Sequence, residues 1–333
     1  MKETGVDNRF RRMGVVLLLV LLSMAAGCAS RAKPFTIVAL PDTQMYSQNH
    51  PDAFLAQTQW IKDHKDELNI VCVVTEGDIT NDNSDTQWAA ADRALTVLDG
   101  VVPWFPVQGN HDMPPGGQVR DATAFNKYVG VQRFQRHHWY GGHFESGNEN
   151  AFYFLDVGQL RFLVVCLEFG PRDEAITWAN HIIAEHKDRP TILVTHCYMN
   201  HDDTRVGPGD PHNPHSYPCN GNDGEDLWEK LVRKHSNVFL VLSGHISGDG
   251  TGRLTSLGDH NNPVHQVVAN YQFRPNGGDG WLRIMTFHPQ ENRIEVRTYS
   301  PTLDQWDEDN ENRFDLQYDM GTPRPAKSAK TRE

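Results

Sequence analysis

The stretch VPWFPVQGNHD, residues 102–112, carries the three polar residues on which the interpretation of the whole chain depends. Its apolar first half is typical of a buried strand, which Gly109 ends. Asn110, His111 and Asp112 follow without a gap, and side chains at the carboxyl end of such a strand face the crevice where α/β proteins bind ligands. They can supply a metal ligand, a proton donor and a group that orients that donor. Taken alone, the four residues GNHD fit a plain polar turn equally well.

Four further apolar runs end in residues of the same kind. We interpret residues 35–40, 70–75, 191–195 and 238–242 as buried strands, with covering helices at 52–65, 86–98 and 175–186. The residues at the strand ends are Asp42 with Gln44, Asp78, His196 and His245. Five such exits in chain order are hard to explain by chance. Oxygen and imidazole ligands without a thiolate suit Zn, Mn or Fe and argue against a structural zinc site.

The spacing of the polar residues after the first and the last of these strands predicts which way their side chains point. Asp42 and Gln44 are two residues apart, as are His245 and Ser247. If the chain leaves each strand in an extended conformation, both side chains of each pair face the same way.

The remaining strands indicate that antiparallel pairing joins a βαβ-like chain. Residues 151–156 and 159–166 are expected to form a hairpin, and residues 264–269, 281–287 and 294–299 to be further strands. A short helix is expected at residues 122–128 within an otherwise loop-rich region.

Residues 1–28 are predicted to be an export signal of the lipoprotein type. Three arginines among the first twelve residues precede an apolar segment too short for a comfortable membrane span, and the ending MAAGC places Cys28 where the lipidated first residue would be. Ordinary cleavage nearby, or an uncleaved anchor, stays open as an alternative. We therefore expect an exported protein of the cell envelope or periplasm that is held at the membrane through a lipidated Cys28.

The rest of the chain is predicted to contain a linker at residues 29–34, one large domain at 35–318 and a disordered tail at 319–333. A formal net charge of −12 argues against binding nucleic acid by charge, and no protein partner is predicted. The cysteines show no CxxC pairing. Because Cys197 and Cys219 bracket one loop of an exported chain, we predict a disulfide between them.

The ordered motifs resemble those of the calcineurin-like metallophosphoesterases. That family has D-x-H, G-D, G-N-H-[DE], a later lone His and G-H-x-H, each after a strand. Here they stand as PDTQ (41–44), GD (77–78), GNHD (109–112), TH (195–196) and GHIS (244–247). The resemblance covers residues 35–299. It implies an α/β (α+β) fold, a four-layer αββα sandwich of two mixed β-sheets flanked by helices.

The resemblance also implies a dinuclear site for two divalent metal ions, of which Mn, Fe and Zn are the candidates. Asp78 would bridge the two ions. Asn110, His196 and His245 would complete one site, and Asp42 would belong to the other.

Two departures from the family pattern fall in the site that contains Asp42. Gln44 and Ser247 occupy the places of two histidines. Because neutral oxygens are poorer donors than imidazole toward Zn or Fe, we expect this second site to be the weaker one. The sequence GDITN has no tyrosine near Asp78, which argues against the purple acid phosphatase branch.

The implied activity is hydrolysis of a phosphate ester, small or polymeric, by a hydroxide ion bound to the metals. His111 would donate a proton or hydrogen bond to the leaving oxygen, with Asp112 setting its tautomer; the alternative is a structural His111. Diesters are favoured over monoesters. A non-catalytic or weakly catalytic binding protein with a degraded second metal site stays open, as does hydrolysis of a phosphonate or sulfate.

The segment at residues 198–226 is the expected specificity element, because it is polar and too long for a plain connection. Its noted residues are His201, Asp202, Asp203, Arg205, His212 and His215. Arg205, Arg253 and Arg274 are candidates for holding a substrate phosphate, and each also fits an ordinary surface arginine. Tyr271 and Trp281 can either stack on a base or pack in the core.

Overall fold

The computed structural model describes residues 33–321. The predicted export signal with Cys28, the linker up to residue 32 and the tail beyond residue 321 lie outside the described residues. Within residues 33–321, no helix has the length and apolar character needed to cross a membrane.

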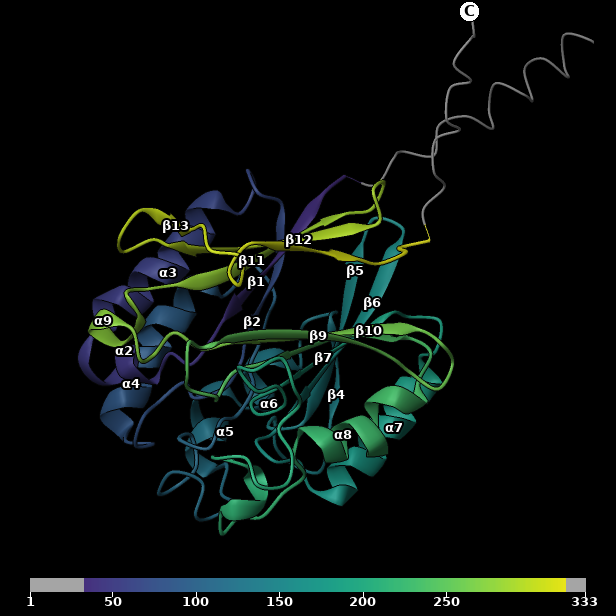
Figure 1. The fold of residues 1–333 in the computed structure, drawn as a ribbon. Helices are drawn as coiled ribbons and strands as arrows, with labels where there is room; N and C mark the ends of the chain where they lie inside the picture. Colours follow the sequence, from purple (N-terminus) through teal and green to yellow (C-terminus); the bar gives the residue numbers. More distant parts are fainter. Residues whose placement is uncertain (1–32, 322–333) are drawn as a thin grey trace, which may run out of the picture. The chain divides into compact units, whose positions relative to one another are not determined.

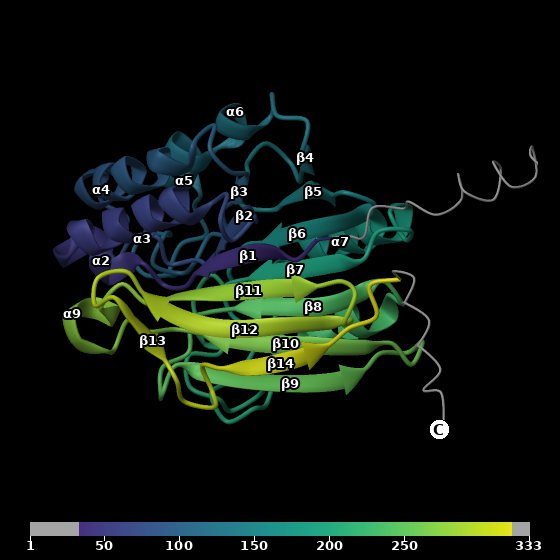
Figure 2. The same cartoon turned by 90° about the horizontal axis from the view of Figure 1, so that it is seen from above.

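Two mixed sheets of seven strands each form the centre of the fold (Figures 1 and 2). The first has the order β13-β12-β11-β1-β2-β3, with β14 pairing with β12. Its strands are β1 (Phe35–Leu40), β2 (Ile70–Thr75), β3 (Trp104–Phe105), β11 (Leu282–His288), β12 (Arg293–Ser300), β13 (Gln305–Asp307) and β14 (Phe314–Gln317). Strands β1, β2 and β3 are parallel, whereas β11 pairs antiparallel with β1.

The second sheet has the order β4-β5-β6-β7-β8-β10-β9. Its strands are β4 (Tyr140–His143), β5 (Ala151–Val157), β6 (Leu160–Leu167), β7 (Thr191–Thr195), β8 (Val238–Ser243), β9 (Thr251–Leu257) and β10 (Pro263–Ala269). Strands β6, β7, β8 and β10 run parallel, and the predicted hairpin of β5 and β6 is confirmed.

Helices cover the outer face of each sheet, which gives the predicted four-layer αββα sandwich (Figure 1). The first sheet packs on α2 (Gln44–Asn49), α3 (Pro51–His64), α4 (Asp85–Leu95), α5 (Thr123–Val129) and α6 (Val131–Phe134). The second sheet packs on α7 (Asp173–Glu185) and α8 (Gly224–Lys230), and the short α9 (Pro275–Gly278) precedes β11.

The alternation of side chains along β1 shows how one strand serves two apolar layers. Phe35, Ile37 and Ala39 belong to the core between the two sheets, whereas Val38 and Leu40 pack on the helices. Because successive side chains point to opposite faces, a strand buried on both sides has to be apolar throughout. This is why residues 35–40 can be recognised from sequence.

Several elements differ from the sequence-based expectation, among them β4, β13, β14, α2, α6, α8 and α9, which were not predicted. The differences at β3 and β9 have clear physical reasons. The apolar run at residues 101–107 pairs as a strand only at Trp104–Phe105, because Pro103 and Pro106 flank that pair and proline has no amide hydrogen to donate. The edge strand β9 was not predicted. Its exposed positions alternate with less exposed ones, and Leu257 at its end is 64% exposed, so it lacks the apolar run that marks the central strands.

Candidate metal centre

One ligand atom from each of four buried side chains converges on a single point at the strand ends. Nε2 of His196 lies 3.1 Å from Oδ1 of Asp78 and 3.1 Å from Oδ1 of Asn110. It lies 3.2 Å from Nδ1 of His245. Asp78 and Asn110 follow β2 and β3 of the first sheet, and the two histidines follow β7 and β8 of the second. The centre is therefore built from both sheets.

Backbone carbonyls fix the tautomers of the two histidines. Nδ1 of His196 donates to the carbonyl of Glu76 at 2.7 Å, and Nε2 of His245 donates to the carbonyl of His212 at 2.9 Å. Each ring thus carries its proton on the nitrogen that faces away from the other residues of the cluster. Nδ1 of His245 then has its lone pair free, and Nε2 of His196 would have one once a cation replaces the proton that it shares with Asp78. This is the arrangement that metal-binding histidines require.

Asp42 lies beside this cluster on the side of the predicted second site. Both of its oxygens are 3.1 Å from the backbone nitrogen of His245, which donates to them. Nε2 of Gln272 donates to Oδ1 at 3.4 Å. Oε1 of Gln44 is buried and has no hydrogen-bond partner within residues 33–321. A buried oxygen without a partner, two residues after Asp42 and in the same cavity wall as Asp78, fits a cation that takes oxygen ligands.

The predicted extended exits from the strands are wrong. Asp42, Asp78 and His245 have φ angles of 39°, 48° and 73°, in the left-handed region, and Gln44 already begins helix α2. Residues other than glycine rarely adopt this backbone conformation, and those that do are concentrated at functional sites. The sharp turns, rather than extended spacing, direct these three side chains into the centre.

Two motif glycines are required by the close approach of ligand side chains. A Cβ atom on Gly109 would lie 2.1 Å from Oδ1 of Asp78, and one on Gly244 would lie 2.1 Å from Oδ2 of Asp42. No larger residue fits at either place without displacing the carboxylate. The glycines of GNHD and GHIS therefore make room for the ligands of the preceding motifs.

His111 takes its orientation from a residue other than the one predicted. Its Nδ1 donates to the carbonyl of Asn81 at 2.6 Å, which leaves Nε2 as the nitrogen available to the cavity. The carboxylate of Asp112 is fully buried and accepts hydrogen bonds from the backbone of Ile79, Thr80 and Gly109. It also accepts from the Thr80 hydroxyl at 3.0 Å.

The prediction that Asp112 sets the tautomer of His111 is therefore wrong. Three backbone amides surround the carboxylate at the junction of two loops, so it joins the loop after β2 to the loop after β3. Burial and the neighbouring Asp78 raise the pKa of Asp112 to about 6, although the backbone amides oppose this rise.

Buried charges dominate the electrostatics of the centre. Burial raises the pKa of Asp42 well above its ordinary value, and the nearby charge of Asp78 adds to this. Burial alone would raise the pKa of Asp78 as well, but the charge and hydrogen bond of His196 hold it below its ordinary value. Burial and the charge of His196 lower the pKa of His245 to about 3, which favours its neutral, ligating form. Burial opposes a charge on His196, but the charge and hydrogen bond of Asp78 raise the pKa of this histidine to about 9. The cluster thus holds positive charge between two carboxylates, a place that a divalent cation can take over from the His196 proton.

A cavity of about 300 Å³ opens over the cluster. Its lining comprises Gln44, Met45, Asp78, Asn81, Asn110, His111, His212, Tyr217, His245, Ser247, Gln272 and Phe273. Ser247, for which we predicted a place in the second metal site, is half-buried in this wall. Asn81, Tyr217, Gln272 and Phe273 were not singled out from the sequence. For Tyr217, the only available signal was its place in the predicted specificity segment.

None of the three arginines proposed to hold phosphate lines this cavity. Arg205 pairs with Glu225 at 3.0 Å, and Arg274 forms an ion pair with Asp307. Arg253 donates to the carbonyl of Asn310 at 3.2 Å. Their guanidinium groups are held elsewhere by long-range partners that the sequence could not reveal. Tyr271 and Trp281 pack together in a buried cluster, which is the core role that we considered.

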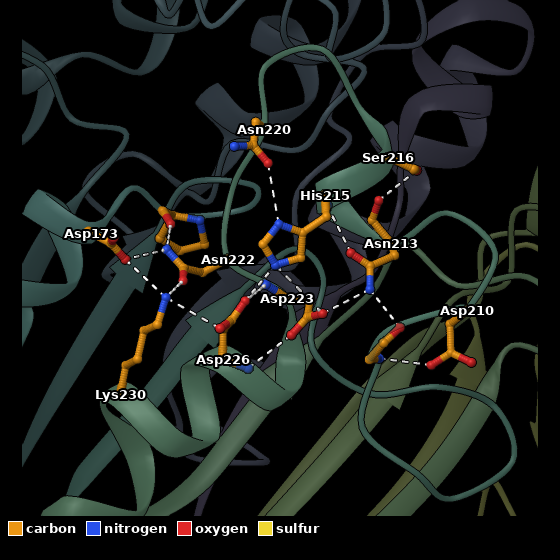
Figure 3. Close-up of polar contacts among 12 residues, drawn as sticks. Asp173, Asp210, Asn213, His215, Ser216, Asn220, Asn222, Asp223, Asp226 and Lys230 are labelled. Carbon is orange, nitrogen blue, oxygen red and sulfur yellow. Dashed lines mark hydrogen bonds and ion pairs between the residues drawn. The ribbon is translucent and has the colours of Figure 1, made fainter.

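Residues 207–230 carry a polar network, which Figure 3 shows. Nδ2 of Asn213 donates to Asp223 at 2.8 Å, and the His215 ring meets Asp226 at 2.6 Å. Asp226 also pairs with Lys230 at 3.3 Å. His215, Asp223 and Asp226 are close enough together to form a metal-ligand group, but Asp223 already caps α8 and the other two are hydrogen-bonded. We interpret this cluster as a structural brace.

The predicted disulfide is wrong, because Cys197 and Cys219 are both free thiols. They lie in one apolar cluster with Phe169. The loop is held instead by Arg120, which pairs with Glu168 at 3.1 Å and donates to the carbonyl of Asn220 at 3.1 Å. A buried ion pair thus fastens this loop without a covalent bond.

A family model described as calcineurin-like phosphoesterase matches residues 35–249, which include every strand-end motif discussed above. The chain belongs to the calcineurin-like phosphoesterase family. Metal-dependent hydrolysis of phosphoesters, with divalent ions at a dinuclear centre, is the chemistry of this family, and the domain is a phosphoester hydrolase. Gln44 and Ser247 are its departures from the family pattern.

Two individual proteins add detail to the family assignment. The chain is 33% identical over 304 residues to the uncharacterized protein YvnB of Bacillus subtilis (strain 168). The match covers 86% of this chain and 22% of that protein, so the chain spans about a fifth of its length. A purple acid phosphatase from yellow lupin (Lupinus luteus) seeds has a similar fold, with a TM-score of 0.53 and 15% identity over 90% of this chain and 57% of that chain.

Proposed function

We propose that the protein hydrolyses phosphodiesters in preference to phosphomonoesters. The observation that carries this proposal is the charge of the cavity. No lysine or arginine is among its lining residues in the described part of the chain, whereas Asp78 contributes a carboxylate. A monoester dianion brings two negative charges and a diester brings one, and phosphate dianions in proteins are normally met by arginine or lysine. A wall without arginine or lysine therefore favours the singly charged ester.

The residues present fit a pair of divalent ions, for which Mn, Fe and Zn are the candidates. Asp78, Asn110, His196 and His245 would hold one ion, and Asp42 with Gln44 and Ser247 would hold the other. When bound, such ions supply Lewis-acid activation of water and neutralise charge on the phosphoryl group.

We propose that His111 is the residue that donates a hydrogen bond or proton to the leaving oxygen. Because the carbonyl of Asn81 holds the proton of Nδ1, the ring presents Nε2 to the cavity in a fixed direction. Protonated at Nε2, it donates a hydrogen bond or proton to the ester oxygen as the bond to phosphorus breaks. Asp112 acts at a distance, by holding together the two loops from which Asp78 and His111 project.

The proposal is tested with esters that share one leaving group. The purified protein, loaded with Mn, is assayed on 4-nitrophenyl phosphate and on ethyl 4-nitrophenyl phosphate. We expect kcat/KM for the diester to exceed that for the monoester by at least about tenfold, a difference of about 1.4 kcal/mol in transition-state free energy. A higher value for the monoester contradicts the diester preference. Bound metal without turnover of either ester would support the alternative, a binding protein with a degraded second site.

We also propose that the protein is exported and anchored at the cell envelope through a lipid on Cys28, where it meets small or polymeric phosphate esters. The support is the arginine-rich start, the short apolar segment and the small residues before Cys28. Expressed in a bacterium, the protein should partition with membranes and incorporate a palmitate analogue. Cys28→Ala should abolish the labelling, and unaltered labelling of that variant would show that Cys28 is not the lipid site.

A further inference from the structure

Tyr217 is held in the wall of the active-site cavity by packing on several sides. Its ring centroid lies 5.0 Å from that of Phe169 and 6.0 Å from that of His245. A Cβ atom on Gly117 would come within 2.9 Å of its ring and within 3.0 Å of Cβ of Asn110, so Gly117 makes room between them. The ring therefore packs against Phe169 and the predicted metal ligand His245, with Gly117 beside it, and it has little freedom to move away.

Hydrogen bonds of the neighbouring residues hold the turn that carries Tyr217, and Figure 3 shows those of Asn213, His215, Ser216 and Asn220. Ser216, the preceding residue, donates through its hydroxyl to the carbonyl of Asn213 at 2.7 Å. The backbone nitrogen of Asn220 donates to the carbonyl of Tyr217 at 2.9 Å. Asn213 and His215 are in turn fastened to Asp223 and Asp226. The turn at residues 213–220 is thus a preorganised support rather than a loose loop.

The hydroxyl of Tyr217 has no hydrogen-bond partner in the part of the chain that the structure describes, and the residue is half-buried. Tyr217 lines the cavity over the metal centre and also an adjoining hollow of about 240 Å³ lined by Gly116, Gln118, His212, Ser216 and Pro218. A side chain that lines both hollows can contact an ester bound in the cavity over the metal centre. Phenols have a pKa near 10, so this group is protonated at neutral pH.

We propose that the Tyr217 hydroxyl donates a hydrogen bond to a non-bridging phosphoryl oxygen of the substrate, in the role that an arginine or lysine often has. This inference rests on the proposed function. It accounts for a phosphate-binding cavity whose described lining has no cationic side chain of lysine or arginine. A neutral donor stabilises the oxygen as its charge grows in the transition state, without the excess attraction for a dianion that a guanidinium would exert.

The test compares Tyr217→Phe with the unaltered protein on two diesters, ethyl 4-nitrophenyl phosphate and ethyl phenyl phosphate. Removing only the hydroxyl should lower kcat/KM by about 10- to 100-fold, the usual loss for one charge-assisted donor. Because the lost bond is to a non-bridging oxygen, the fold-loss should be the same for the good and the poor leaving group. The matched control is Tyr128→Phe, which removes a hydroxyl on α5 that bonds to Asp85 and should leave kcat/KM unchanged.

Four results would overturn this role for Tyr217. Unchanged activity of Tyr217→Phe on both diesters would show that the hydroxyl touches nothing that matters. A much larger loss on the phenyl ester would make Tyr217 the acid for the leaving group. Loss of bound metal, or loss of a visible phenolate band from the iron-loaded protein, would make it a metal ligand. If the unaltered protein hydrolyses neither diester, the proposed function is contradicted, and this outcome is distinguished from the others because it does not depend on the Tyr217→Phe variant.

Discussion

At the scale of single residues, the centre depends on conformations that most side chains avoid. Asp42, Asp78 and His245 have left-handed backbone conformations. Gly109 leaves space for the carboxylate of Asp78, and Gly244 leaves space for that of Asp42. Strained turns of this kind persist only where surrounding contacts fix them, each at a cost of about 1–3 kcal/mol. The backbone amide of His245, which bonds to Asp42, is one such contact. The same contacts that hold the ligands thus also hold the strained backbone.

His111→Gln should lower kcat on a phosphodiester by about 10²- to 10⁴-fold, the range expected when a general acid is removed. Metal content should stay the same, because Nδ1 of His111 bonds to a carbonyl and the ring is outside the four-atom cluster. Steady-state kinetics together with metal analysis checks both points. His137→Gln, an exposed histidine outside the cavity, is the control. If His111→Gln empties a metal site, the residue is a ligand and the role assigned here is wrong.

The variant Asp112→Asn should lower the free energy of unfolding of the protein. The carboxylate accepts from three backbone amides and one hydroxyl while fully buried, and an asparagine would turn an NH₂ group toward those donors. We expect the free energy of unfolding to fall by about 3 kcal/mol, measured by urea denaturation. Thr80→Val, which removes one of these hydrogen bonds, should cost about 1 kcal/mol. Full stability with a large loss of kcat would instead restore Asp112 as the partner of His111.

At the scale of elements, one loop joins the catalytic centre to a helix on the far side of the second sheet. The segment between β7 and α8 supplies the carbonyl of His212 to the ring of His245, and then the ring of Tyr217 to the cavity. It is tied to α8 through His215 and Asp226. A specificity loop of this length needs such anchors, because a loop with few contacts to the rest of the protein is mobile and opens easily.

His215 should make the stability of this loop depend on pH. The hydrogen bond to Asp226 raises the pKa of His215, with Asp223 and Asn220 also facing the ring and Lys230 behind Asp226. A histidine whose folded pKa is raised stabilises the fold fully below its unfolded pKa of about 6.5, and that contribution is lost as pH rises through the folded value.

The variant His215→Gln measures this contribution. Since the His215 side chain is 49% exposed, solvent screens the pair and the effect should be at most about 1 kcal/mol. The variant should be less stable than the unaltered protein at pH 5.5, with the difference shrinking by pH 9, as measured by urea unfolding at both values. A difference that grows with pH would contradict this account.

At the scale of the whole molecule, the centre exists only where two sheets meet. Asp78 and Asn110 come from one sheet and His196 and His245 from the other, and the ligand atoms of the other three residues lie within 3.2 Å of Nε2 of His196. The apolar core between the sheets therefore sets the geometry of the metal centre. Binding of an ion that contacts both sheets should in turn stabilise the packed state by mass action.

The two metal sites should differ in affinity. The first has two imidazoles, an amide oxygen and the carboxylate of Asp78, whereas the second has Asp42 with the neutral oxygens of Gln44 and Ser247. The purified protein should keep one ion through dialysis and take up a second only from excess Mn or Mg, with activity rising accordingly. Gln44→His combined with Ser247→His should bring the tightly held number toward two, as counted by elemental analysis. Two ions that survive dialysis against a chelator in the unaltered protein would contradict this.

The sequence by itself determined which positions make up the centre. The central strands are buried on both faces, so they are continuous apolar runs, and the polar residue after each run marks a strand end. The glycine of GD has a positive φ that its own turn requires, whereas the glycines of GNHD and GH leave space for Asp78 and Asp42 of other motifs. Within each motif the apolar run and the polar residue lie within a few residues of each other, and for that reason the family, the fold class and the candidate ligands could be inferred from the sequence.

Only the tertiary structure decided what each polar group contacts. Asp112 bonds to backbone some thirty residues away, His245 to the carbonyl of His212, and the three arginines pair outside the cavity. Tyr217 enters the site through a loop whose course is set by α8 and Arg120. The physical reason is that partners for a buried polar group are selected by the packing of distant segments, and neither local spacing nor hydrophobic periodicity encodes that packing.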